Sequence, residues 1–367
     1  MIRRTFVVLF AAWAVLAAGI ARSAESATPN DTARFLAGLQ PSEGSPLVPF
    51  AHERDWDQHA NYMNSAFDKV ETRQLSKIRK WSSEHLTNPR PTLFYMFGGP
   101  DFLYANAFFG NANTYVLSGL EPVGTVPDLT SLPRGSMPSI LSNFRGSLGS
   151  ILSVGYFITH EMRTALNSTR LSGTLPVLYV FLARSGKTIE SVELINLDDK
   201  GEVHPGDGQG TKSAVHGVKI AFTDGERHKT LYYFSGDLSD DTFKRGGFAK
   251  FCDGLGVGDS LVKSASYLLH SGNFSGVRDF LLTHSSTILQ DDTGIPAAQF
   301  DPARWKLSAF GRYLGPISIF ADRYQPKLKE IYQKQSPNPL DFGIGYRWQA
   351  DQSNLLVAVR TDLQTAQ

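Results

Sequence analysis

Two adjacent carboxylates in the last third of the chain are the strongest candidates for catalytic groups in this sequence. Asp291 and Asp292 follow an apolar run, residues 287–290, which predicts a short strand. Neighbouring carboxylates raise one another's proton affinity, so one can act as a general acid while the other acts as a base. His160 is their candidate partner. The same residues could instead cap helices and tie turns, because Asp in turns is common for local reasons.

A second acidic group is expected to bind a ligand. Residues 91–121 predict a strand, a Gly98-Gly99-Pro100-Asp101 turn, a short helix and a second strand that ends on Glu121. This arrangement places a turn and a carboxylate at one edge of a sheet. Asp237 also follows a predicted strand, so Asp101, Glu121 and Asp237 form the candidate ligand-binding group.

Several familiar motifs have near matches that fail at a required position. Residues 185–188, Ser-Gly-Lys-Thr, lack the earlier glycine and the following helix of a phosphate-binding loop. His160-Glu161 lacks the second histidine that a zinc-peptidase helix carries one turn later, because residue 164 is threonine. Ser260 and Lys263 match S-x-x-K, but no K-T-G follows. Asp292-Thr293-Gly294 resembles the aspartic-protease triplet, yet no second triplet exists. The sequence therefore predicts no metal site and no cofactor.

The predicted helices and strands around these residues indicate an α+β fold with a mixed sheet. Residues 175–183 and 189–197, and then 217–223 and 229–235, predict two hairpins, hence an antiparallel meander over 175–235. This meander is expected to join the strand-turn-helix-strand unit at 92–121, with helices covering the sheet. Predicted helices include 52–85 and 259–270, and 342–348 with 354–360 predicts a terminal hairpin. The alternative is an α/β Rossmann-like three-layer fold.

The start of the chain predicts export. Arg3 and Arg4 precede an uncharged apolar run, residues 6–20, and small residues follow, which is typical of a cleavable signal peptide. We expect cleavage after Ser23 or Ser26, leaving residues 24–367 as one globular domain in the periplasm or outside the cell. An uncleaved membrane anchor is the alternative interpretation.

Composition and charge exclude some partners. Of 36 basic residues, removal of residues 1–23 takes three arginines and leaves 33, against 35 acidic residues, a net charge of −2. This balance gives no electrostatic reason to expect binding to nucleic acid or to an anionic membrane. Cys252 is the single cysteine, so no intrachain disulfide can form. The oligomeric state is not predicted.

Two resemblances accompany these predictions. The stretch 91–121 resembles the first strand, turn and acidic second strand of methyltransferase-type Rossmann folds, although it lacks their spaced glycines, and an exported protein would not meet their usual nucleoside cofactor. Most of the chain resembles an uncharacterised group of exported bacterial proteins, on the segments GGPDFLYANAFF, TYVLSGLEPVG, LPVLYVFLARSG, ILQDDTGIP and LDFGIGYRW. No activity is established for that group, so the resemblance implies the extent of the domain and no chemistry.

The function expected from the sequence is binding of a small ligand or a cell-envelope component without transforming it. A periplasmic hydrolase using Asp291, Asp292 and His160 is the first alternative. A purely structural envelope protein is the second, and it would have no enclosed polar pocket.

Overall fold

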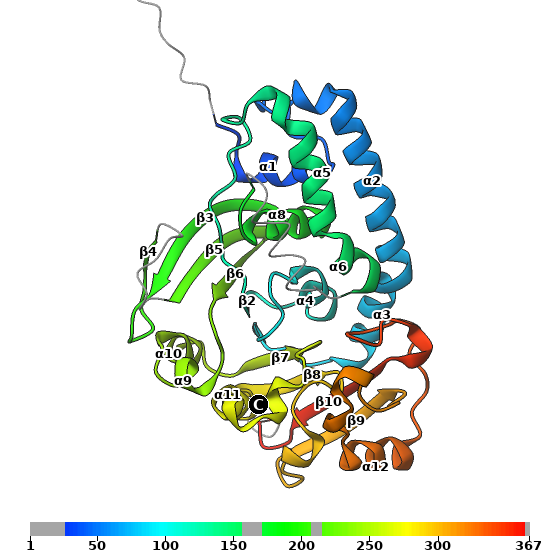
Figure 1. The fold of residues 1–367 in the computed structure, drawn as a ribbon. Coiled ribbons are helices and arrows are strands. Elements are labelled where there is room, and N and C mark those ends of the chain that lie inside the picture. The colour runs from blue at the N-terminus through cyan, green and yellow to red at the C-terminus, as the bar shows by residue number, and fades with distance from the viewer. Residues whose placement is uncertain (1–25, 156–170, 207–214, 364–367) are drawn as a thin grey trace, which may run out of the picture.

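One mixed sheet of ten strands runs through the described part of the chain. The computed structural model describes residues 26–155, 171–206 and 215–363 (Figure 1). The strand order is β4-β3-β5-β6-β2-β1-β7-β8-β10-β9. In chain order the strands are β1 Thr92–Tyr95, β2 Thr114–Gly119, β3 Thr188–Leu197, β4 Val203–Pro205, β5 Val215–Asp224, β6 Arg227–Ser235, β7 Gly258–Val262, β8 Ser285–Gln290, β9 Trp305–Gly311 and β10 Asn354–Arg360.

The centre of the sheet is parallel and its margins are antiparallel. Strands β6, β2, β1, β7 and β8 are mutually parallel neighbours. On one side β5, β3 and β4 continue the sheet in antiparallel fashion, and on the other side β10 and β9 do so. The chain moves outward from β1 to β2 and β6, and then returns to β7 on the opposite side of β1. This reversal creates a topological switch point between β1 and β7, where open α/β sheets bind their ligands.

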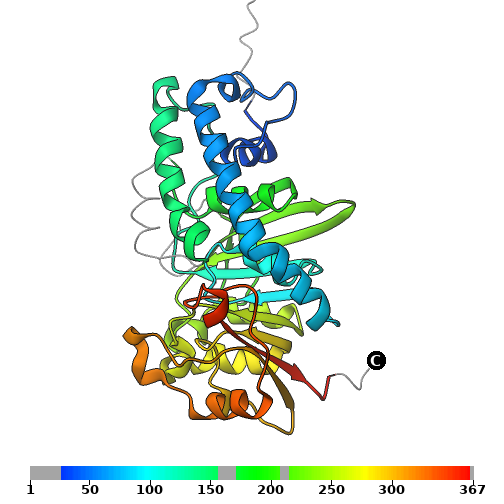
Figure 2. The same ribbon diagram turned by 90° about the vertical axis from the view of Figure 1, so that its right-hand side faces the viewer.

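Helices cover both faces, as the burial along β1 requires. Leu93 and Tyr95 belong to one buried apolar cluster, whereas Phe94 and Met96 belong to the other, because alternate residues of a strand point to opposite faces. The first cluster packs against α1 Pro29–Leu36, α2 Arg54–Val70, α3 Ser76–His85, α4 Phe102–Phe108, α5 Met137–Ser147, α6 Gly149–Val154 and α8 Leu175–Arg184. The second packs against α9 Asp240–Phe243, α10 Gly247–Gly254, α11 Ser275–His284 and α12 Pro326–Gln335 (Figure 2).

This arrangement confirms a mixed sheet and the strand-turn-helix-strand unit, which is β1, α4 and β2. Helices on both faces of the parallel centre also give it the three layers of the Rossmann-like alternative. Cys252 is fully buried in the second cluster, and burial raises the pKa of its thiol well above the ordinary value. No helix among the described residues has the length and hydropathy needed to cross a bilayer.

Each margin of the sheet carries a feature that disfavours addition of a further strand. At one margin β4 is a short, exposed strand that ends on Pro205, a residue that cannot donate a ladder hydrogen bond. At the other margin the Gln335 side chain, at the end of α12, pairs with the free edge of β9. Its Oε1 accepts from the Ala309 amide at 2.8 Å, and its Nε2 donates to the Leu307 carbonyl at 2.8 Å.

Three element predictions are wrong. Residues 175–183 form helix α8 rather than a strand, so the meander consists of β3, β5 and β6 only. Every residue from Leu175 to Ala183 is buried, and an apolar run without periodicity does not distinguish a buried helix from a buried strand. Pro176 in the first helical turn was the available signal.

The other two errors lie near the C-terminal half of the sheet. The predicted helix at 259–270 is instead strand β7 followed by an irregular loop, because a central parallel strand is apolar on both faces and shows no alternation. The terminal hairpin partner of β10 is β9, which the sequence did not predict, and residues 342–348 form a turn region. The proposed signal peptide lies outside the described residues.

Candidate functional site

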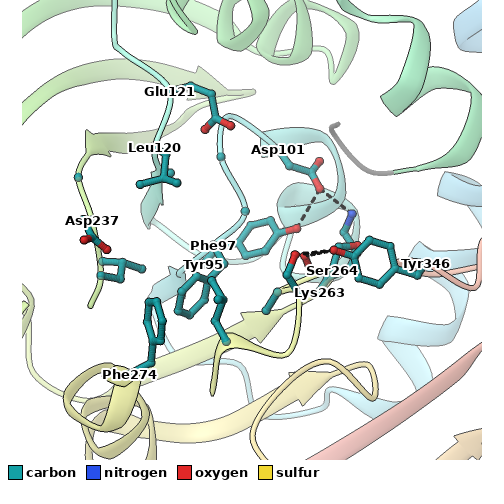
Figure 3. A pocket seen from close by; sticks show the side chains of 18 residues that line it. Tyr95, Phe97, Asp101, Leu120, Glu121, Asp237, Lys263, Ser264, Phe274 and Tyr346 are labelled. Carbon is teal, nitrogen blue, oxygen red and sulfur yellow. Dashed lines mark hydrogen bonds and ion pairs between the residues drawn. The ribbon is translucent and has the colours of Figure 1, made fainter. Parts of the chain in front are cut away.

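A pocket of about 480 Å³ opens at the carboxyl ends of β1, β2, β6 and β7 (Figure 3). It lies at the switch point between β1 and β7, where the loops that follow neighbouring parallel strands turn to opposite faces and leave a crevice. The loops after these four strands supply most of its wall, and Phe274 and Tyr346 complete it. The sheet topology therefore creates the site.

All three predicted ligand-binding residues line this pocket. Asp101 follows β1, Glu121 follows β2 and Asp237 follows β6. Asp237 is exposed at the surface, where its carboxylate accepts hydrogen bonds from the amide and the hydroxyl of Ser239 at 2.8 and 2.7 Å. The structure thus brings together acidic residues that are 136 positions apart in the chain (237 − 101).

Glu121 is seated between two glycines. The residue is only 4% exposed, and its carboxylate is directed toward the loop after β1 (Figure 3). A Cβ at Gly119 would lie 2.5 Å from Oε2 of Glu121, and a Cβ at Gly99 would lie 3.4 Å from it. Gly99 is also in the left-handed region, φ +57°, and its amide donates to the Ser118 carbonyl of β2 at 2.9 Å. Glycine is needed at 119 because the carboxylate occupies the space that a side chain would fill, and at 99 because of the left-handed backbone conformation.

Asp101 forms the buried floor of the pocket. Its Oδ2 accepts from the Tyr95 hydroxyl at 3.0 Å and lies 2.9 Å from Nζ of Lys263, while its Oδ1 caps helix α4 by accepting from the Tyr104 amide at 3.1 Å. Burial raises the pKa of Asp101, and the Lys263 charge and these hydrogen bonds oppose that rise. Asp101 therefore ties β1, α4 and β7 together at the base of the site.

The ammonium group of Lys263 binds other groups of the protein at the floor of the pocket. Besides Asp101, its ammonium group donates to the Gly155 carbonyl at 2.6 Å and lies 4.3 Å from the centre of the Tyr104 ring. Its side chain is 1% exposed. It is the only cation among the lining residues that the structure describes, and it is neutralised in place.

The two loops at the switch point are held in a costly backbone conformation. Phe97 after β1, and Ser264, Ser266 and Tyr267 after β7, all have positive φ, between 49° and 66°. Residues with side chains rarely adopt these angles, and such strain concentrates at functional sites. Phe97, Ser264 and Ser266 line the pocket. The strain is thus an observation independent of the acidic residues, and it points to the same place.

The predicted catalytic residues are placed differently. Asp291 and Asp292 are buried behind the loop after β7 and do not line the pocket. Asp291 accepts hydrogen bonds from the amides of Ser264 and Thr293, both at 3.0 Å. Asp292 accepts from the Tyr267 hydroxyl at 2.5 Å and from Nδ2 of Asn354 at 3.0 Å.

Burial is the largest cause that raises the pKa of both aspartates, and the Asp292 charge raises that of Asp291 further. Each carboxylate holds several groups of the protein in place. The third member of the predicted group, His160, lies outside the described residues.

A metal could be held at one place among the described residues. Asp198, Glu202 and His204 lie within 4.8 Å of one another by their ligand atoms, on the β3–β4 turn. Asp198 already accepts from the amides of Lys200 and Glu202, and Glu202 and His204 are exposed. This group is a solvated turn away from the pocket.

Sequence reasoning missed Lys263, Tyr95 and Tyr346. Lys263 was considered only as part of an S-x-x-K helix, but it follows strand β7, where a lysine directly after an apolar run is a signal for a strand-end residue. Tyr95 lies in a run of apolar and aromatic residues, so nothing in the sequence distinguishes it from the core residues beside it. Tyr346 comes from a segment far along the chain and carries no local signal.

No family model matches this chain, and a search of curated proteins finds no similar sequence. The fold and the pocket themselves define the class: a mixed, centrally parallel α/β sheet with a pocket at its switch point. The resemblance to exported bacterial proteins stays a prediction.

Proposed function

We propose that the protein binds a small nucleoside-type ligand, with vicinal hydroxyls and a flat apolar ring, in the pocket at the switch point. The observation that carries the proposal is the Glu121 carboxylate, seated between Gly99 and Gly119 at the ends of adjacent parallel strands. In doubly wound folds an acidic residue after the second strand accepts hydrogen bonds from ribose hydroxyls. Because fold alone does not assign function, the remaining support for this proposal comes from the charges and the wall of the pocket.

The charges of the pocket favour a neutral or cationic ligand over a phosphorylated one. Three carboxylates line it, and the lining cation, Lys263, is paired with Asp101. Dinucleotide sites place the pyrophosphate at the N-terminus of the helix after the first strand. Here Asp101 occupies that position and accepts from the Tyr104 amide, so this amide at the N-terminus of α4 is not free to bind a phosphate.

The apolar side of the pocket supports a flat ring. Phe97 and Phe274 contact each other with ring centres 6.0 Å apart, and Leu120 is 60% exposed although it is a large apolar residue. If the sugar of the ligand binds to Glu121, the attached flat ring would cover the exposed side chain of the neighbouring Leu120. Asp237 lies beyond Leu120 and offers an acceptor to an amino group on such a ring (Figure 3).

Binding can be tested with adenosine, ribose and AMP on residues 24–367. A ligand that binds only the folded state raises the midpoint of thermal unfolding. We expect adenosine to raise it, ribose to raise it less, and AMP to be weaker than adenosine. The Glu121→Gln variant, which keeps the side-chain volume, should lose at least about tenfold in adenosine affinity, or about 1.4 kcal/mol. Tighter binding of AMP, or no response to adenosine, would overturn the proposal. A response to ribose alone would be one such result, and it would point to a sugar ligand such as an envelope glycan.

Export remains part of this proposal, since residues 1–23 carry the features of a signal peptide. Expression of the full chain with sequencing of the mature N-terminus tests it, and we expect a start at Ala24 or Ala27. The ligand would then be one that is present outside the cytoplasm. The hydrolase alternative gains no support from Asp291 and Asp292, because both bind other parts of the protein.

A further inference from the structure

Tyr346 reaches the pocket on a tight turn that belongs to a distant part of the chain. We call residues 343–348 the Tyr346 turn. Ile344 and Arg347 close it with reciprocal backbone hydrogen bonds of 3.1 and 3.0 Å, and Gly345 between them has φ +56°. The Tyr346 hydroxyl lies 2.6 Å from the Ser266 hydroxyl, on the strained loop after β7. The turn therefore supplies one wall of the site.

The turn is seated so tightly that it cannot shift without disturbing the pocket loops. A Cβ at Gly345 would lie 2.0 Å from Oδ2 of Asp291 and 3.2 Å from Oγ of Ser264. Asp291 in turn holds the Ser264 amide. The Tyr346 ring also packs against Phe320, with ring centres 6.0 Å apart. Displacement of the turn would thus release Tyr346 and loosen Ser264 and Ser266 together.

One side chain from the N-terminal helices holds both ends of this turn. Oε1 of Gln74 accepts from the Gly343 amide at 2.9 Å, and its Nε2 donates to the Trp348 carbonyl at 3.2 Å. Gln74 is 2% exposed. Other anchors hold only one side of the turn or its base: Arg347 donates to the Gly315 carbonyl, and Lys77 to the Asp341 carbonyl. Among the described residues, the Gln74 side chain is the one that binds both ends of the turn.

The helix is locally distorted where Gln74 lies. Residues Glu71–Leu75 form a π-helical segment between α2 and α3, and the long helix is otherwise regular. Such segments have poorer hydrogen-bond geometry than an α-helix and occur frequently at functional sites. The distortion lies at the residue that holds the Tyr346 turn.

We infer that Gln74 is a positioning residue for the ligand pocket, acting through the turn that carries Tyr346. The inference rests on the proposed function for its ligand, but the geometry of the turn can be measured without one. Loss of both Gln74 hydrogen bonds would leave a backbone amide and a carbonyl of the turn unpaired, which favours conformations that expose them to water.

The ligand-free measurement uses a thiol at the pocket. Cys252 is fully buried, so Ser266→Cys supplies the one reactive thiol, and its reaction rate with a disulfide reagent such as DTNB reports how well Tyr346 covers it. We compare this variant alone, with Gln74→Leu and with Gln58→Leu, the same substitution at an exposed position of α2. Gln74→Leu should raise the rate roughly tenfold, because loss of a net hydrogen-bond contribution increases the population of the displaced turn by about that factor. Gln58→Leu should not change the rate. An unchanged rate with Gln74→Leu would overturn the inference.

The second measurement uses adenosine and Ser266 intact. Gln74→Leu should weaken adenosine binding roughly tenfold. Gln74→Glu keeps the acceptor for the Gly343 amide but places a carboxylate oxygen against the Trp348 carbonyl, so it should weaken binding as well. A faster thiol reaction with unchanged adenosine affinity would show that the turn moves without serving the ligand, and it would also overturn the inference. If the wild-type protein does not bind adenosine, the proposed function fails, whereas the thiol rates still decide whether Gln74 positions the pocket wall. Gln74→Glu tests the same points if Gln74→Leu does not fold.

Discussion

Nζ of Lys263 lies 2.9 Å from Oδ2 of Asp101, and the two side chains are 1% and 2% exposed. Removal of one partner of a buried ion pair strongly destabilises the folded protein, because the other charge is left buried without compensation. Lys263→Met should therefore lower the free energy of unfolding by about 3 kcal/mol. The measurement is urea denaturation. Arg245→Met is the control, since Arg245 pairs with Asp241 at the surface and should change little. Equal effects of the two variants would contradict a stabilising role for the buried pair.

Gly119→Ala should weaken both ligand binding and folding. Its Cβ would lie 2.5 Å from Oε2 of Glu121 and 2.8 Å from Cα of Gly99, so the carboxylate must move. We expect adenosine affinity to fall at least about tenfold, with a loss of about 1–3 kcal/mol in stability from overpacking. Calorimetric titration measures the first and urea denaturation the second. Gly146→Ala, where a Cβ would meet no atom within 4 Å, is the control and should change neither property unfavourably.

Asp259 should make the protein less stable as the pH rises from 4 to 7. The carboxylate is buried at the amino end of β7, and this burial raises its pKa to about 6, although the amides of Arg90 and Thr287 donate to it at 2.7 and 3.0 Å. The unfolded chain has a pKa near 4, so the folded state binds the proton more tightly. This group therefore costs no stability below about pH 4, and its contribution lowers the free energy of unfolding by about 3 kcal/mol as the pH rises through 6.

Asp259→Asn should remove this contribution and flatten the pH dependence between pH 4 and 6. Urea unfolding at several pH values measures it, and Asp241→Asn at an exposed position is the control. Identical slopes for the wild type and Asp259→Asn would show that this carboxyl does not titrate in that window.

Ser264→Gly should stabilise the protein while weakening the site. Ser264 has φ +54°, which glycine adopts without strain, and its buried hydroxyl has no hydrogen-bond partner among the described residues. The stability should rise by about 1 kcal/mol, and adenosine affinity should fall because the loop after β7 becomes less rigid. Ser336→Gly, at the positive-φ end of α12, should stabilise without affecting adenosine. A destabilised Ser264→Gly would contradict the interpretation of strain at this loop.

The parts of the site that sequence predicts are those with local signals. The Gly98-Gly99 turn, the apolar runs of β1 and β2 and the carboxylate of Glu121 all lie within one short stretch, and each belongs to a recognisable pattern. Because parallel strands joined by a helix end at the same edge of a sheet, the pattern within this stretch places Asp101 and Glu121 together. Asp237 lies at that edge because β6 pairs with β2 in parallel, which the sequence did not predict.

The features that the sequence did not predict depend on contacts between distant segments of the chain. The pairing of β9 with β10, the Lys263 ion pair and the approach of Tyr346 each join residues far apart in the chain. The prediction of a strand for Leu175 to Ala183 was wrong for another reason. A uniformly buried run has no polar face from which the helical period could be recognised. The buried roles of Asp291 and Asp292 were equally invisible, because their partners are backbone amides and side chains that only the fold supplies.

The two margins of the sheet have a consequence for how copies of this chain can meet. Pro205 at the end of β4 lacks an amide proton, and the Gln335 side chain already pairs with the Ala309 amide and the Leu307 carbonyl of β9. A strand from a second molecule would find no donor at Pro205, and on β9 it would have to displace the Gln335 side chain. Both features disfavour growth of the sheet by strand addition at these two positions.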